Sequence, residues 1–142
     1  MIYVKDIMSG NVRTVGGGST IAQAAKAMVK WKVGALIVVD GRTPVGIITE
    51  GDISRSVAKG VDADTNLKDF AKRKLITVAP GELLEVAART MAEAGVKKLP
   101  VMEDGKLVGI VTQTDIVSAS FALVTSLKEM VKARYRPPDF EM

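Results

Sequence analysis

Two stretches decide the fold of this chain: Val45-Gly46-Ile47-Ile48-Thr49-Glu50-Gly51-Asp52-Ile53 and Val108-Gly109-Ile110-Val111-Thr112-Gln113-Thr114-Asp115-Ile116. The second repeats the first at an offset of 63 residues (115 − 52). At the same offset, and without a gap, the match continues upstream through Thr14/Thr77, Gly18/Gly81, Ala24/Ala87, Met28/Met91 and Leu36/Leu99. Solenoid proteins need three or more repeats to bury a continuous core. Two copies therefore indicate one duplicated unit whose copies pack on each other, so a site in one copy has a twin in the other.

Composition narrows the functions that the chain can carry. At 142 residues it suits one compact body that buries roughly 70% of its unfolded surface. Hydrophobic residues make up 47% and aromatic residues 4%, so we expect an aliphatic core. The absence of cysteine excludes disulfides and thiolate metal sites, and the absence of histidine removes the commonest general base and metal ligand. We therefore expect no catalytic residues, no metal site and no enzyme activity.

Charge and hydropathy bear on the partners of the chain. The net charge of +4, with both signs interspersed, permits anionic ligands but gives no concentrated basic arm for nucleic acid. No apolar run approaches the ~20 residues that span a bilayer, and the N-terminus lacks the pattern of a signal peptide. The sequence predicts a soluble, cytoplasmic protein with neither a membrane nor nucleic acid as a partner.

Each repeat shows the same order of elements. A short β-prone run, 12–15 or 76–78, is followed by a Gly or Pro break and then by a helix that begins at Ser19-Thr20 or at Glu82. The apolar stripes of these two helices are Ile21, Ala24, Ala25, Met28 and Val29, and Leu84, Ala87, Ala88, Met91 and Ala92.

A hairpin and a second helix complete each repeat. The predicted strands, 35–39 and 45–49 in the first repeat and 99–102 and 107–112 in the second, flank turns that contain Asp-Gly, a strong hairpin signal. Glu50 and Gln113 then begin further helices. We expect the second of these to run from Thr114 to about Arg134, because Arg136-Pro137-Pro138 must stop it.

The order β-α-β-β-α, found twice with Gly-hydrophobic-hydrophobic-Thr-x-x-Asp at the last strand-to-helix junction, resembles the CBS domain, named after cystathionine β-synthase. Two in tandem resemble a CBS pair, or Bateman module, over Val4 to about Ser120. The resemblance implies an α+β fold of two repeats packed with pseudo-two-fold symmetry, each led by a short segment, Val4–Met8 or Leu67–Ala71. We assign residues 1–61 to the first repeat, 62–122 to the second and 123–142 to a C-terminal helix and tail.

The resemblance also implies two ligand clefts, each built across both repeats. The cleft of Asp52 is expected to contain Thr49, Gly51, Asp52, Arg55, Ile76, Thr77, Lys97, Lys98, Leu99 and Pro100. The cleft of Asp115 is expected to contain Val12, Arg13, Thr14, Gly34, Ala35, Leu36, Thr112, Thr114 and Asp115. The implied ligand is an adenine nucleotide held between apolar side chains, without aromatic stacking, because no Phe, Tyr or Trp stands at these positions.

Two interpretations fit Asp52 and Asp115, and they are compatible. Each acid follows a threonine by three residues at a helix start, the pattern of a helix cap. Each could also accept hydrogen bonds from the two hydroxyls of a ribose, while the threonine and the first amides of the helix hold a phosphate.

Charge distinguishes the two clefts. Lys97 and Lys98 are either phosphate ligands of the Asp52 cleft or solvated surface charges, and Arg55 is a further candidate there. The Asp115 cleft has Gly34-Ala35 at the matching place, with only Arg13 to supply charge. We therefore expect AMP to prefer the Asp52 cleft.

The leading functional hypothesis is a regulatory module that binds an adenine nucleotide, most simply AMP, and passes the signal to a partner protein. The alternatives are a docking module without nucleotide, or a sensor of S-adenosylmethionine, whose sulfonium cation would sit badly beside Lys97 and Lys98. A homodimer is also expected, because the C-terminal helix carries more apolar side chains than a free tail needs. These side chains are Phe121, Leu123, Val124, Leu127, Met130 and Val131.

Overall fold

The computed structural model describes residues 1–70 and 75–134 of the chain. Two predicted features fall outside these residues: the end of the second leading segment, at Ala71, and the helix stop at Arg136-Pro137-Pro138. The first repeat contains α1 (Val4–Ile7), β1 (Thr14–Gly16), α2 (Ile21–Trp31), β2 (Ala35–Asp40), β3 (Thr43–Thr49) and α3 (Glu50–Ala58). The second contains α4 (Leu67–Phe70), α5 (Leu84–Ala94), β4 (Lys98–Glu103), β5 (Lys106–Thr112) and α6 (Gln113–Arg134).

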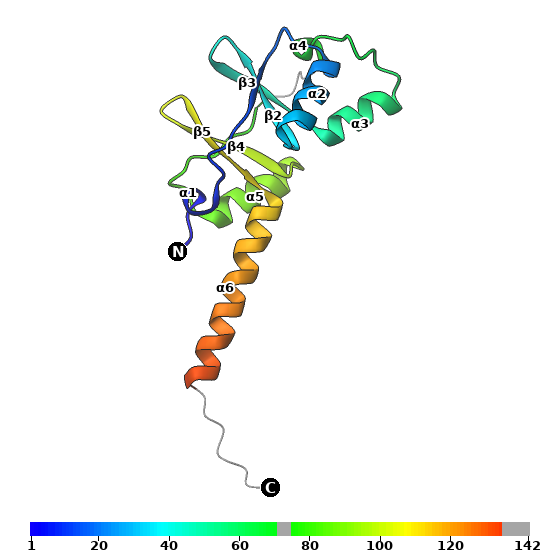
Figure 1. Cartoon of the computed structure of the whole chain (residues 1–142). Helices are drawn as coiled ribbons and strands as arrows, with labels where there is room; N and C mark the ends of the chain where they lie inside the picture. Colours follow the sequence, from blue (N-terminus) through cyan, green and yellow to red (C-terminus); the bar gives the residue numbers. More distant parts are fainter. Residues whose placement is uncertain (71–74, 135–142) are drawn as a thin grey trace.

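Two small sheets form the centre of the molecule (Figure 1). In the first, β1 is parallel to β2 and β2 is antiparallel to β3; in the second, β4 is antiparallel to β5. Both predicted hairpins are confirmed. The strand predicted at 76–78 is shorter than expected, since only Val78 forms a bridge, parallel to Val101. In the second sheet, the place that β1 takes in the first is thus marked by one residue pair only.

The helices α2 and α5 cover one face of each sheet with the stripe that the sequence predicts. Ile21, Ala24 and Met28 are buried on α2, and Leu84, Ala87 and Met91 are buried at the matching positions of α5. The stripe is narrower than predicted, because Val29 is 80% exposed. The helix α2 begins at Ile21, next to its predicted start, and Thr20 caps it. The helix α5 begins at Leu84, two residues after the predicted start, with no side-chain cap.

The short leading segments cross between the repeats. Val4, at the start of the first repeat, is fully buried in the core of the second, with Val78, Met91 and Leu99. Leu67, at the start of the second repeat, is fully buried in the core of the first, with Ile21 and Leu36. Each repeat is therefore completed by a side chain of the other.

Backbone hydrogen bonds hold both crossings in equivalent ways. The amide of Val4 donates to the carbonyl of Glu82 at 2.9 Å, and the amide of Leu67 donates to the carbonyl of Ser19 at 2.8 Å. These pairs are related by the same offset of 63 residues that relates the sequences. The crossing is thus a symmetric feature of the fold, and neither sequence repeat has a complete core of its own.

Gly109 permits the first of these crossings. A Cβ added at this buried residue of β5 would lie 2.9 Å from the carbonyl oxygen of Ser9 and 2.9 Å from Met8 Sδ. Ser9 and Ile110 exchange two backbone hydrogen bonds of 2.9 Å, so the carbonyl of Ser9 has little freedom to move. The absence of a side chain at Gly109 therefore lets Met8 and Ser9 lie directly against β5.

We expect Gly109→Ala to lower the free energy of unfolding by about 1–3 kcal/mol, the usual cost of overpacking. Urea denaturation of the purified variant measures this loss. Gly10→Ala is the matched control, because a Cβ at Gly10 would meet no atom within 4 Å. Equal stability of the two variants would contradict the close approach.

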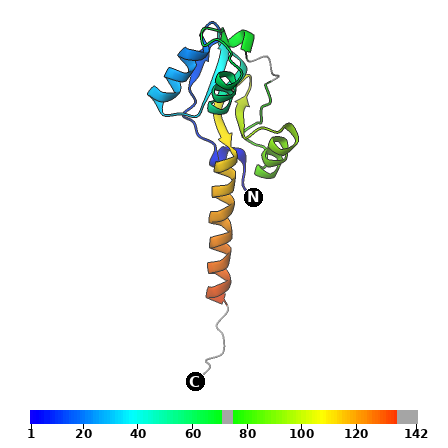
Figure 2. The ribbon, with the colours of Figure 1, turned by 90° about the vertical axis from the view of Figure 1, so that its right-hand side faces the viewer.

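The helix α6 leaves the body of the molecule. In the two perpendicular views of Figures 1 and 2 it projects from the end of β5, and most of its length lies beside no other described element. Its described range, Gln113–Arg134, agrees with the prediction from the sequence. No helix in the described part of the chain is both long enough and apolar enough to cross a membrane.

Candidate functional site

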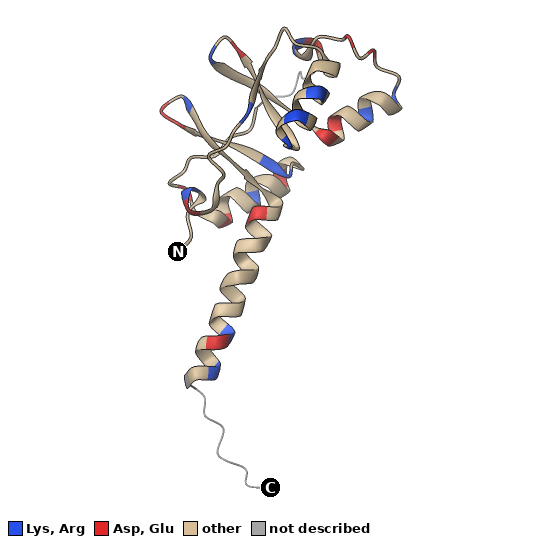
Figure 3. Cartoon of the chain, in the orientation of Figure 1, with Lys and Arg blue, Asp and Glu red and all other residues tan. Residues whose placement is uncertain are grey.

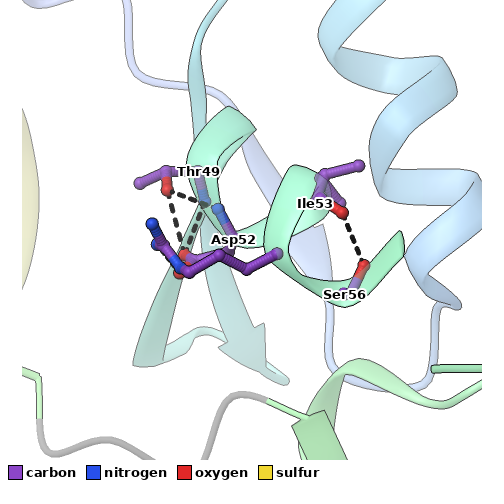
Figure 4. A network of polar contacts seen from close by, with 5 residues as sticks. Thr49, Asp52, Ile53 and Ser56 are labelled. Atoms are coloured by element: carbon purple, nitrogen blue, oxygen red, sulfur yellow. Dashed lines mark hydrogen bonds and ion pairs between the residues drawn. The ribbon is translucent and has the colours of Figure 1, made fainter. Parts of the chain in front are cut away.

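Thr49 and Asp52 form a closed cap at the start of α3. Asp52 Oδ2 accepts hydrogen bonds from the amide and from the hydroxyl of Thr49, both at 3.0 Å, and the Thr49 hydroxyl accepts from the amide of Asp52 at 3.2 Å. Figure 4 shows the carboxylate turned back towards Thr49. The capping interpretation is confirmed here, and contact with a ribose stays a prediction.

Arg55 completes this network. Its guanidinium donates to Asp52 Oδ1 at 2.8 Å, so both carboxylate oxygens of the buried acid have a partner. A phosphate ligand would have to share Arg55 with Asp52. At the start of α3, the side chains of Asp52 and Arg55 are therefore engaged in contacts that stabilise the fold.

A hollow of about 470 Å³ lies beside this network, lined by Asp52, Arg55, Ser56, Lys59, Phe70 and Gly95. Of the ten residues predicted for the Asp52 cleft, only Asp52 and Arg55 belong to this lining. Phe70 places an aromatic ring where none was expected, because the prediction considered only positions matched between the repeats. Lys59 was also missed, since it lies two helical turns after the motif.

The other predicted members of the Asp52 cleft are not gathered there. Leu99 and Pro100 are fully buried, so their side chains belong to the core. Thr77 and Lys97 are exposed to solvent, and Ile76 packs against the core of the second repeat. Of the remaining three residues, Thr49 and Gly51 stand at the start of α3, and Lys98 is the first residue of β4.

A second cleft, of about 200 Å³, lies before the start of α6. Its lining comes from both repeats, as the resemblance implies: Ser9, Asn11, Val12, Arg13, Val33, Gly34, Ala35, Ile37, Lys98, Ile110 and Thr112. Five of the nine residues predicted for the Asp115 cleft line it, namely Val12, Arg13, Gly34, Ala35 and Thr112. Sequence comparison between the repeats missed Ser9 and Asn11, which stand just before the matched β-prone run.

Four predicted residues stand outside this lining. The side chain of Leu36 is fully buried in the first core, and those of Thr14 and Thr114 are exposed. Asp115 caps α6: its carboxylate accepts from the amide of Thr112 at 3.0 Å, and its own amide donates to the Thr112 hydroxyl at 3.1 Å. The cap repeats that of Asp52, and it fixes Thr112 at the wall of the cleft.

Lys98 lies in this cleft and not in the cleft of Asp52, which corrects the prediction. The register of the second hairpin pairs Lys98 with Thr112. Its Nζ reaches across to the first repeat, where it lies 2.8 Å from the place of a Cβ on Gly34, and the Glu50 carboxyl carbon lies 3.6 Å from the same place. Gly34 thus leaves room for the ammonium group, and the Asp115 cleft gains a cation that had been assigned to its twin.

Arg13 is the second cation of this cleft. Its guanidinium lies 5.0 Å from the centre of the Trp31 ring, a cation–π contact of the kind that Arg prefers. Trp31 also packs against the core of the first repeat. The ring therefore holds Arg13 at the rim of the cleft, so two cations and the first turn of α6 surround one space.

The family model of the CBS domain matches the chain twice, over residues 4–59 and 67–122. The chain belongs to the CBS-domain family. Together the two matches make this chain a tandem CBS pair.

Two relatives differ in how much of their own length this CBS pair matches. It is 37% identical to the uncharacterised protein MJ1225 of Methanocaldococcus jannaschii, over 80% of this chain and 41% of the relative. It is 36% identical to the CBS domain-containing protein YhcV of Bacillus subtilis, over 82% of this chain and 84% of the relative. The pair thus spans less than half of one relative and most of the other.

Among solved structures, the CBS domain pair of protein MJ0100 in complex with 5′-methylthioadenosine and S-adenosyl-L-methionine is similar to this chain. The TM-score is 0.77 at 31% identity, over 86% of this chain and 97% of the other. Both compounds named in that complex contain an adenosine group.

Proposed function

We propose that this CBS pair is a non-catalytic regulatory module that binds an adenine nucleotide, most simply AMP, in the cleft before α6. The observation that carries the proposal is the presence of Lys98, Arg13 and Thr112 in the lining of one cleft. The ligand's occupancy of this cleft is the signal, and a partner protein receives it.

The cleft combines three features that suit a nucleotide. Apolar side chains of Val12, Val33 and Ile110 offer surface for a base. The first turn of α6, with the Thr112 hydroxyl, presents the positive end of a helix dipole. Lys98 and Arg13 add full charges, and charge-assisted hydrogen bonds are about twice as strong as neutral ones.

The charges also support a choice between AMP and S-adenosylmethionine. Both carry adenine and ribose, but AMP adds a phosphate anion and S-adenosylmethionine a sulfonium cation. Glu50 lies close enough to Lys98 to offset part of its charge, whereas Arg13 faces an uncharged ring. The remaining positive charge favours the phosphate. S-adenosylmethionine is the second candidate, because the similar MJ0100 structure contains it.

We expect Lys98→Ala to weaken AMP binding by about tenfold, the loss of one charge-assisted hydrogen bond of roughly 1.5 kcal/mol. Adenosine, which lacks the phosphate, should lose about twofold or less, and the salt dependence of AMP binding should fall. Isothermal titration calorimetry with AMP, adenosine and S-adenosylmethionine measures all three effects.

Lys97→Ala is the matched control, since Lys97 is the exposed neighbour of Lys98 and does not line the cleft. It should change neither affinity. Equal losses for AMP and adenosine in Lys98→Ala would contradict a phosphate contact. Tighter binding of S-adenosylmethionine than of AMP to the unaltered protein would replace the first candidate by the second, and no heat with any adenosine compound would favour a docking module.

A further inference from the structure

The apolar side chains of α6 beyond its first turn are exposed to solvent. Val117, Phe121, Leu123, Val124, Leu127, Met130 and Val131 are between 47% and 74% exposed. At roughly 100 Å² for each side chain, they present on the order of 700 Å², more than the largest apolar patch of a typical monomer. This area is close to the ~800 Å² that each partner contributes to a stable protein interface.

Four of these side chains follow a heptad pattern. Val117, Val124 and Val131 recur at intervals of seven residues, and Leu127 lies between the last two, at the d position if the valines are at a. Phe121, Leu123 and Met130 widen this seam on both sides. β-branched residues at a together with leucine at d favour two parallel helices.

The charge distribution of α6 agrees with a buried seam. No charged residue occurs from 116 to 127, and Figure 3 shows α6 charged only near its start and towards its far end. The same stretch contains valine, serine and threonine, which are weak helix formers. A projecting helix of this composition is marginal in water without a packing partner.

We infer that α6 pairs in parallel with α6 of a second copy of this chain, through a seam centred on Val124 and Leu127. A second copy fits because its surface has the same length, the same heptad phase and the same lack of charge, as a two-fold interface requires. The projection of α6 from the body leaves its whole far half free to pair (Figures 1 and 2).

Light scattering of the full chain at micromolar concentration tests this pairing. We expect twice the 15.1 kDa mass of one chain. The variant Val124→Glu/Leu127→Glu should show the mass of a single chain, because it places four carboxylates in the seam of a dimer. The control Ala122→Glu/Ser126→Glu adds the same charge away from the seam and should remain dimeric. A single-chain mass for the unaltered protein, or a fully dimeric Val124→Glu/Leu127→Glu variant, would overturn the proposal.

Cross-linking gives an independent measurement on folded protein. Because the chain has no cysteine, a single introduced thiol reports only on its own position. Val124→Cys should form a disulfide between two chains under mild oxidation, since residues at a face each other across a parallel seam. Ala122→Cys, on the opposite side of α6, should not. Equal cross-linking of the two variants would overturn the seam, and efficient cross-linking of Val117→Cys only to Val131→Cys would overturn the parallel direction.

Discussion

Replacing Leu67 by alanine is expected to destabilise the first repeat, although Leu67 belongs to the second by sequence. Its side chain is fully buried among Ile21, Leu36 and other residues of the first core. Leucine-to-alanine changes at such sites lower the free energy of unfolding by about 2.5–5 kcal/mol, through lost transfer energy and a residual cavity. Urea denaturation followed by circular dichroism measures the change.

Val57→Ala provides the control, because Val57 is 73% exposed and contacts neither core. It should change the free energy of unfolding by less than about 0.5 kcal/mol. The unfolding transition of Leu67→Ala should also remain a single step, since each core contains a side chain from the other repeat. Two separate transitions would contradict the interdependence of the cores.

The second large effect is expected at Asp52. In Asp52→Ala the amide of Thr49 and the guanidinium of Arg55 lose a charged acceptor at a buried site. Because hydrogen bonds to charged groups contribute about 1.5–3 kcal/mol, we expect a loss of about 2–3 kcal/mol. For a protein of this size the melting temperature should fall by roughly 5–10 °C.

The repeat supplies a matched control in Asp115→Ala. Asp115 makes the same cap with Thr112 but is only half-buried, and no arginine pairs with it among the described residues. The loss of a cap alone costs about 1 kcal/mol. Thermal unfolding of the two variants should therefore differ by several degrees. Equal losses would show that Arg55 and burial add nothing to the Asp52 network.

The parts of the fold that depend on neighbouring residues could be predicted from the sequence. Asp104-Gly105 between β-branched runs predicts a hairpin, and the spacing from Thr49 to Asp52 predicts a cap, because each signal acts within a few residues. The matched offset added the tandem arrangement of these elements. Local chemistry, repeated twice, predicted the order of the elements, and the resemblance to the CBS domain implied how the two repeats pack.

The crossing of the leading segments could not be predicted in the same way. Val4 and Leu67 are apolar residues in short segments, and either core could accept them as far as hydrophobicity is concerned. Which core each residue enters depends on contacts between residues far apart in the sequence, such as the hydrogen bond from Val4 to Glu82. No periodicity within one repeat records such a contact.

The error at Lys98 has a related cause. Matched positions assigned Lys97 and Lys98 together to one cleft, yet β4 begins at Lys98, and Lys97 precedes the strand with its side chain exposed to solvent. The register of Lys98 with Thr112 sends only this side chain into the cleft before α6. The direction of a side chain at a strand end thus decides which site it serves, and sequence offset alone does not contain that direction.

The position of α6 gives the protein a lever. The helix begins at the wall of the cleft, where Asp115 fixes it to Thr112, and its 22 residues extend for about 33 Å at 1.5 Å per residue. A tilt of about 5° at Gln113 would therefore displace the backbone at Arg134 by about 3 Å. A small change in the cleft, one that leaves the fold intact, would in this way move the far tip of the helix by about the length of a hydrogen bond.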